Sequence, residues 1–215
     1  MSKKNKKKNG LKIGLFTFII IAVISGIGYF SMQILGTEKQ PEEEPVVKKN
    51  ESEIEGYGIT LDDHDTDLYR SEYTLLKENL ESDTIDFSAY AESVAKLFII
   101  DLYTIKNKTN KYDTGGVEFV EPSTVENYKL NVEDTLYKYV EDNTNNTRTQ
   151  SLPVVDSIEV TKKSEEKFKM ESEDKEYQAY KITLTWTYSN DLGYDTKGEV
   201  IVINKENKLY VVEKN

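Results

Sequence analysis

The chain has 215 residues and no cysteine, and its formal net charge at pH 7 is −11. A chain of this length forms one domain of ordinary size with short additions. The lack of cysteine excludes disulfides, thiolate catalysis and the acylated cysteine of a bacterial lipoprotein. Residues 1–12 hold six lysines and no acid, so residues 13–215 carry −17. Nucleic acid is therefore excluded as a partner, because its binding depends on Lys and Arg that neutralise phosphates.

A membrane anchor is predicted over residues 13–35, which read IGLFTFIIIAVISGIGYFSMQIL without a charged side chain. About 20 apolar residues in a helix cross the hydrocarbon core of a bilayer. Lysines precede this segment and glutamates follow it, so the positive-inside rule places the N-terminus in the cytoplasm. A cleaved secretory signal is the alternative, but such a signal has a shorter apolar region and a small-residue cleavage site. We expect a single-pass protein of the cell membrane.

The remaining chain divides into a linker and a folded domain. Residues 36–57 are rich in Glu, Lys and Pro and poor in apolar side chains. Such a segment cannot bury enough surface to fold, so it is predicted to be a charged, flexible stalk. Residues 1–12 are then a basic cytoplasmic tail, and residues 58–215 form the extracytoplasmic domain.

Three helices are expected in the first half of this domain. Asp65 and Thr66 begin a segment in which apolar residues recur at helical spacing up to Leu80. A second helix over residues 88–106 is the most apolar, so it should lie centrally. A short strand over residues 117–120 precedes a third helix that Pro122 opens, with a capping box formed by Ser123 and Glu126. The apolar face of the third helix comprises Val125, Tyr128, Val132, Leu136 and Tyr139.

The second half of the domain has the period of β-strands. Strands are expected over residues 152–161, 177–188, 199–203 and 209–212, with a turn at 204–208 and a long exposed connection at 162–176. Segregated helices and an antiparallel meander predict an α+β domain whose sheet curls around the central helix.

This order of elements resembles the NTF2-like superfamily, the cystatin-like α+β cone. With one N-terminal membrane helix ahead of the domain, the chain is most similar to the membrane-tethered VirB8 and TcpC type of conjugation and type IV secretion machinery. The resemblance covers about residues 60–215 and rests on the order of elements, with no diagnostic motif. It implies a non-enzymatic assembly component that faces the cell envelope, although other branches of the superfamily are enzymes with a pocket in the cone. The Lys- and Asn-rich composition suits a Gram-positive bacterium.

Asp101 is the main candidate for chemistry, because it interrupts the apolar run LFIIDLY. At 100° per residue it lies on the same helical face as Tyr90 and Leu97. Trp186, on the inner face of a predicted strand, completes a candidate pocket with these three residues. Burial would raise the pKa of Asp101 toward that of a general base. The alternative, which we favour, is a structural acid that accepts hydrogen bonds from Tyr or Thr hydroxyls or pairs with a lysine at the rim.

Other motifs favour structural interpretations. Asp63, Asp65 and Asp67 have the spacing of a calcium loop, but Leu68 stands where glycine is needed and Thr74 where a bidentate glutamate is needed. His64 is the only histidine, so neither a catalytic triad nor a zinc site is expected. The DTGG sequence at 113–116 predicts a tight turn. No metal and no cofactor is expected.

The sequence therefore predicts a membrane-anchored module that binds other envelope proteins or itself. A small-molecule-binding or enzymatic domain that uses Asp101 is the alternative, and a purely structural surface protein is a third. A paired array of further acids or a histidine facing Asp101 would favour the enzyme, and a flat, apolar, exposed sheet edge would favour assembly.

Overall fold

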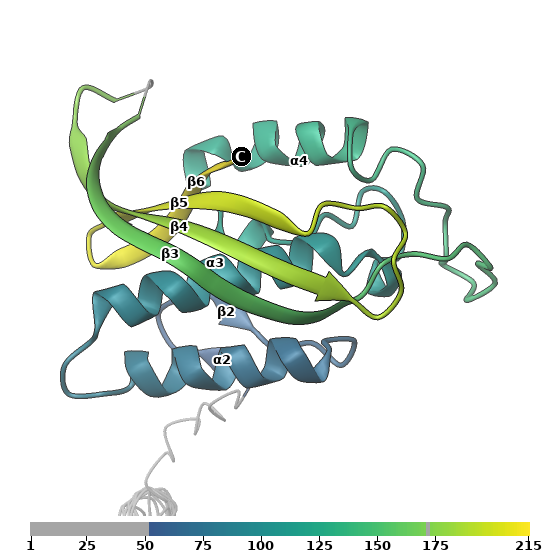
Figure 1. Ribbon diagram of the computed structural model, residues 1–215, viewed down its shortest axis with the longest axis horizontal. Helices are drawn as coiled ribbons and strands as arrows, with labels where there is room; N and C mark the ends of the chain where they lie inside the picture. Colours follow the sequence, from purple (N-terminus) through teal and green to yellow (C-terminus); the bar gives the residue numbers. More distant parts are fainter. Residues whose placement is uncertain (1–51, 171–172) are drawn as a thin grey trace, which may run out of the picture. The chain divides into compact units, whose positions relative to one another are not determined.

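The computed structural model describes residues 52–170 and 173–215, and these form an α+β domain (Figure 1). The predicted membrane segment 13–35, the tail 1–12 and most of the stalk lie outside the described residues. Within the described part of the chain, no helix combines the length and the hydropathy that a membrane crossing requires. The α+β class is confirmed.

The first helix, α2 (Asp67–Leu80), begins where its capping residue predicts. The hydroxyl of Thr66 accepts a hydrogen bond from the backbone N–H of Tyr69 at 3.2 Å, which satisfies one of the free N–H groups of the first turn. The apolar stripe of α2, including Tyr73 and Leu76, is buried against α3 (Phe87–Tyr103). Asp86 caps α3 by accepting from Ser88 and Ala89.

The helix α3 is the centre of the core, as its composition predicts. It is buried on most of its surface and contacts all four long strands. In Figure 1 it lies behind the strands, with α2 on one side and α4 (Val125–Asp134) on the other. The short 3₁₀ helix η1 (Ile105–Asn107) follows it.

A four-stranded antiparallel meander forms the second layer. Its strands lie in chain order, β3 (Val155–Lys169), β4 (Glu176–Tyr188), β5 (Lys197–Lys205) and β6 (Lys208–Lys214). On β4, alternate side chains from Tyr180 to Trp186 face α3, as the period of two predicts. The β5–β6 hairpin turns at Glu206 and Asn207, whose φ angles of 57° and 65° suit a two-residue turn. The edge strands are therefore β3 and β6.

The domain begins earlier than residue 58. The strand β1 (Glu53–Ile54) pairs with β2 (Ile59–Thr60), and the side chain of Ile54 is buried in the core. Composition alone placed these residues in the stalk because a single buried isoleucine among charges gives little signal.

The predicted strand 117–120 is wrong. Val117–Phe119 is the 3₁₀ helix η2, and only Val120 forms a bridge, parallel to Val211 of β6. Gly116 has a φ of 78°, which bends the chain sharply and buries Phe119 in a single turn. A short apolar run cannot be assigned to strand or helix from its period alone.

The third helix is shorter than predicted and capped differently. Pro122–Thr124 forms the 3₁₀ helix η3, and the carboxylate of Glu121 accepts from the N–H of Ser123 at 2.8 Å in place of the Ser123–Glu126 capping box. After Asp134 the hydroxyl of Thr135 donates to the carbonyl of Asn131, which competes with the helix. The chain then buries Tyr137, whereas Tyr139 is 78% exposed.

The predicted connection 162–176 is mostly strand. β3 and β4 stay paired from Val155–Tyr188 to Lys169–Glu176 as an exposed ribbon. Its end is fixed because Met170 and Tyr177 pack with Ile201 and Ile203 on the outer face of the sheet. The charges of residues 162–169 concealed this strand, since most side chains on both faces of this part of β3 are exposed.

Candidate functional site

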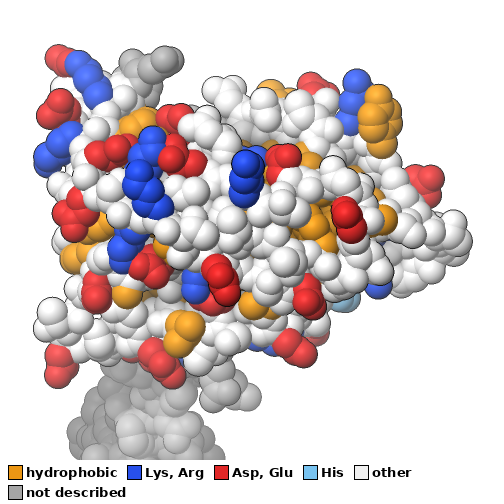
Figure 2. Space-filling view, viewed as in Figure 1, with side chains coloured by type: hydrophobic (Ala, Val, Ile, Leu, Met, Phe, Trp, Pro, Cys, Tyr) orange, Lys and Arg blue, Asp and Glu red, His pale blue; other side chains and the backbone are white. Residues whose placement is uncertain are grey.

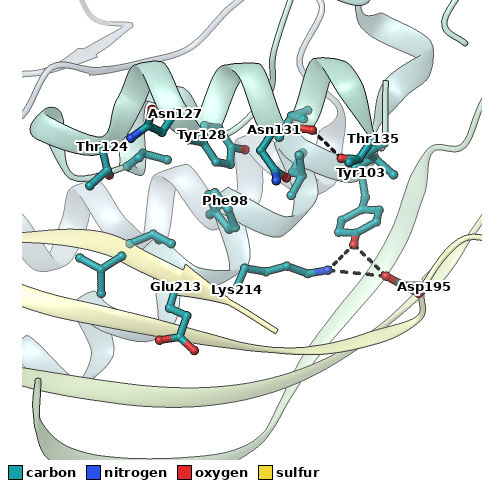
Figure 3. Close-up of a pocket in the computed structure, with 16 residues that line it drawn as sticks. Phe98, Tyr103, Thr124, Asn127, Tyr128, Asn131, Thr135, Asp195, Glu213 and Lys214 are labelled. Carbon is teal, nitrogen blue, oxygen red and sulfur yellow. Dashed lines mark hydrogen bonds and ion pairs between the residues drawn. The ribbon is translucent and has the colours of Figure 1, made fainter. Parts of the chain in front are cut away.

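Two cavities of different chemistry flank α3. The first, about 590 Å³ in volume, is an open groove between α4 and β6, which we call the α4–β6 groove (Figure 3). The second is a polar cleft of about 310 Å³ beside Asp101, between the start of α2, the end of α3 and the turn at 113–118.

The floor of the α4–β6 groove is apolar. Phe98 and Leu102 of α3 form it together with Val120, Val132 and Val211. Hydrophobic side chains are visible beneath α4 in the space-filling view, among acidic and basic side chains that are intermingled elsewhere on this face (Figure 2). An apolar floor with polar walls is typical of a binding site.

One wall of the groove is a polar, uncharged stripe of α4. Asn127 and Asn131 are four residues apart, so they lie one above the other on one helix face, and Thr135 follows directly after the helix. In Figure 3 the amides of Asn127 and Asn131 reach from α4 toward the cavity. Neither amide has a hydrogen-bond partner among the described residues. These groups can therefore bond a ligand without breaking an internal contact.

The other wall is the edge strand β6. Near its start the outer edge is occupied, because the N–H of Leu209 donates to the hydroxyl of Tyr90 at 3.3 Å and the carbonyl of Val211 accepts from the N–H of Glu121 at 3.0 Å. Beyond Val211 the groove opens along Val212, Glu213 and Lys214.

A polar network closes one end of the groove. The ammonium of Lys214 donates to the hydroxyl of Tyr103 at 2.6 Å, and this hydroxyl donates to the carboxylate of Asp195 at 3.2 Å (Figure 3). Burial, together with the nearby charge of Asp195, raises the pKa of Tyr103, so its hydroxyl stays protonated at neutral pH. The network holds the ammonium of Lys214 inside the site, where the carboxylate of Asp195 is its ion-pair partner.

A second network fixes the opposite end. Burial alone would raise the pKa of Glu121, but hydrogen bonds from Ser123 and Lys205 outweigh it and hold that pKa below its usual value. Lys205 bridges Glu121 at 2.9 Å and Glu173 at 2.8 Å. The ionised Glu121 thus secures the segment that covers the start of β6.

Asp101 lies in the polar cleft as a partnered acid. Its carboxylate forms an ion pair with Lys108 and accepts from the N–H of Gly116 at 2.6 Å. The side chains of Asp101 and Lys108 are 17% and 11% exposed. The lysine at the rim is the partner that the structural interpretation predicts, whereas no Tyr or Thr hydroxyl contacts the carboxylate among the described residues.

The other members of the candidate pocket do not join Asp101 in either cavity. The hydroxyl of Tyr90 accepts a hydrogen bond from the backbone of β6, and Leu97 is fully buried. Trp186 donates to the hydroxyl of Tyr188 at 2.8 Å and packs on Tyr103 with ring centroids 5.1 Å apart. These three residues fill the core because α3 is packed on nearly every side.

Carboxylates surround Asp101 in the cleft. Asp62, Asp65, Asp113 and Glu118 line it with the exposed His64. Burial, followed by the charge of Asp101, raises the pKa of both Asp65 and Glu118, although hydrogen bonds from Asp62 and Thr60 act in the opposite direction. No group of three His, Cys, Asp or Glu residues that could hold a metal ion occurs in the described part of the chain.

Asp65 provides a test of this electrostatic interpretation. A carboxyl group whose pKa is raised by folding adds stability below its unfolded pKa, and this contribution is lost as the pH rises through the folded pKa. Asp65→Asn should therefore raise the melting temperature by about 1–3 °C at pH 7 and give no gain near pH 4. Thermal unfolding at both pH values measures the effect. Asp63→Asn removes the same charge from an exposed position, and an equal gain from it would contradict the interpretation.

Sequence reasoning missed the α4–β6 groove. The usable signal was the row of Asn127, Asn131 and Thr135 in a strongly charged segment, since asparagine and threonine are poor helix formers. Their partner wall, Val212 to Lys214, comes from residues 77 to 87 positions later, and no local pattern reports that contact. In comparisons with known proteins, the chain matches no family model, no curated protein and no solved structure.

Proposed function

We propose that the chain is a single-pass membrane protein of a bacterial cell envelope whose extracytoplasmic domain binds other proteins as an assembly component. The observation that carries the proposal is the α4–β6 groove, in which an apolar floor lies between unpartnered amides and a strand edge. An exposed sheet edge is a common site for the addition of another chain.

The predicted anchor agrees with this role. The uncharged segment 13–35 and the lysines before it favour a tethered domain outside the cell. The resemblance of the predicted order of elements to the NTF2-like, VirB8 and TcpC type is the basis for proposing a place in secretion or conjugation machinery. Self-association is an alternative within the same class of function.

Photo-crosslinking in cells tests the proposal. A photoreactive amino acid at position 131 faces the groove, whereas one at position 130 lies on the neighbouring outer surface, where Leu130 is 58% exposed. We expect a discrete crosslinked partner from position 131 and little or none from position 130. Equal yields at the two positions would contradict binding at the groove.

A small-molecule site at the polar cleft is the second candidate. The observation that favours it is the group of carboxylates around Asp101, which is the arrangement expected of an acid–base site. Against it, both oxygens of Asp101 are engaged, by Lys108 and by Gly116. Loss of cellular function in Asp101→Asn with an unchanged melting temperature would favour this candidate over a structural role.

A further inference from the structure

Backbone groups at the outer edge of β6 indicate which kind of ligand the α4–β6 groove can bind. Glu199 and Asn215 exchange two backbone hydrogen bonds, at 2.8 and 2.9 Å. In an antiparallel ladder, bonded pairs alternate with pairs whose N–H and C=O groups point away from the partner strand. The neighbouring pair of Val200 and Lys214 is therefore of the second kind. The backbone N–H and C=O of Lys214 point away from β5, toward the outer edge of the sheet.

The α4–β6 groove fits one extended strand. From Asn127 to Asp134 at its end, α4 spans about 10 Å, which corresponds to roughly three residues of extended chain. A strand in the groove would bond the outer edge of β6 on one side and the amides of α4 on the other. Its alternate side chains would meet the apolar floor around Phe98 and Val132.

Charge decides the composition of this strand. Residues 13–215 carry a net charge of −17, and Glu213 lines the groove on β6 although its exposed carboxylate points away from α4 (Figure 3). The one lysine in the lining, Lys214, is already paired with Asp195. A basic partner segment is therefore favoured and an acidic one disfavoured.

A second copy of the domain fits less well. It has the same negative charge, and the β6 of a second copy would bring its own β5 into the space that α4 fills (Figure 3). Resting on the proposed function, we propose that the α4–β6 groove binds an extended segment of a different protein, in which apolar and basic residues alternate, by adding it as a strand beside Lys214.

Binding of a synthetic peptide of alternating lysine and valine to the full chain in phosphatidylcholine nanodiscs tests this proposal by fluorescence anisotropy. Both Lys214→Pro and Lys214→Ala remove the lysine side chain. Only Lys214→Pro also removes the backbone N–H that points to the outer edge. We expect Lys214→Pro to bind about fivefold more weakly than Lys214→Ala, since one hydrogen bond is lost. A peptide of alternating glutamate and valine should not bind.

The groove itself is tested separately. Asn131→Arg places a positive charge inside the groove, and Leu130→Arg places the same charge outside it. The first should weaken binding of the basic peptide about tenfold and the second should leave it within about twofold. If Asn131→Arg acts but Lys214→Pro equals Lys214→Ala, strand addition is refuted while binding at the groove stands. Absence of saturable binding, or equal effects of the two arginines, refutes both.

Two further outcomes would identify a different occupant of the groove. A concentration-dependent dimer that Lys214→Pro dissociates would overturn the proposal in favour of a second copy. A photo-crosslink from position 131 that stays within one chain would assign the groove to a segment of the chain itself and would equally overturn it.

Discussion

Replacing Gly115 with alanine should destabilise the domain by about 3 kcal/mol or more, an effect at the upper end of those measured for overpacked sites. A Cβ at this position would lie 2.2 Å from the carbonyl oxygen and 2.7 Å from the carbonyl carbon of Asp101. Both atoms belong to the backbone of α3, so neither can move without displacing the central helix. Chemical denaturation followed by circular dichroism measures the loss.

Gly193→Ala is the matched control. Gly193 has a φ of 77°, but a Cβ there would meet nothing within 4 Å. It therefore carries the backbone strain of an alanine in the left-handed region, about 1 kcal/mol, without a clash. A Gly115→Ala protein no less stable than Gly193→Ala would show that the turn at 113–116 does not pack on α3 as described.

Asp101→Asn should cost about 2 kcal/mol of folding free energy, since a buried hydrogen-bonded charge is removed from its partner. The variant keeps the size of the side chain but leaves the ammonium of Lys108, which is 11% exposed, without its counter-ion. The free energy of unfolding in denaturant measures the cost.

Lys108→Met and the double variant complete a thermodynamic cycle. Because the two charges stabilise each other, the double variant should be more stable than the sum of the two single losses predicts, by about 1 kcal/mol or more. Additive losses would mean that the ion pair contributes nothing, and the structural assignment of Asp101 would then lose its basis.

Much of the fold could be predicted because its signals are local. The helix around Tyr73 and Leu76 has its own cap, and β4 alternates apolar and polar side chains over its whole length. The position of Asp101 on the same helix face as buried apolar residues also followed from the helical period, and its side chain is 17% exposed. In each case the residues that carry the pattern are those that form the element.

The errors concern contacts between distant segments. The third helix ends early because Tyr137 is buried, with its hydroxyl donating to the carbonyl of Leu102 at 2.7 Å. Val120 lies beside Val211 of β6, and the neighbouring Glu121 is held by Lys205, 84 residues later. Tyr90 and Trp186 also lie apart from the cleft beside Asp101, and each is engaged by a residue that a helical projection cannot show.

The charged ribbon of β3 and β4 shows a further limit. Residues 162–169 have the composition of a loop, yet they pair in register with β4. Backbone hydrogen bonds to β4, in which Tyr177, Ala179 and Tyr180 are buried, hold this part of β3 although most of its own side chains are exposed. Composition alone therefore underestimates strand length where most side chains of a strand are exposed.

Cysteine labelling tests most directly whether a protein partner occupies the α4–β6 groove outside the cell. The chain contains no cysteine, so Asn131→Cys and Leu130→Cys each introduce a single thiol. A membrane-impermeant maleimide should label both thiols in the purified protein. In intact cells, the account predicts labelling at position 130 and protection at position 131. Equal labelling of both positions in cells would contradict occupancy of the groove, and labelling of neither would contradict the extracytoplasmic location.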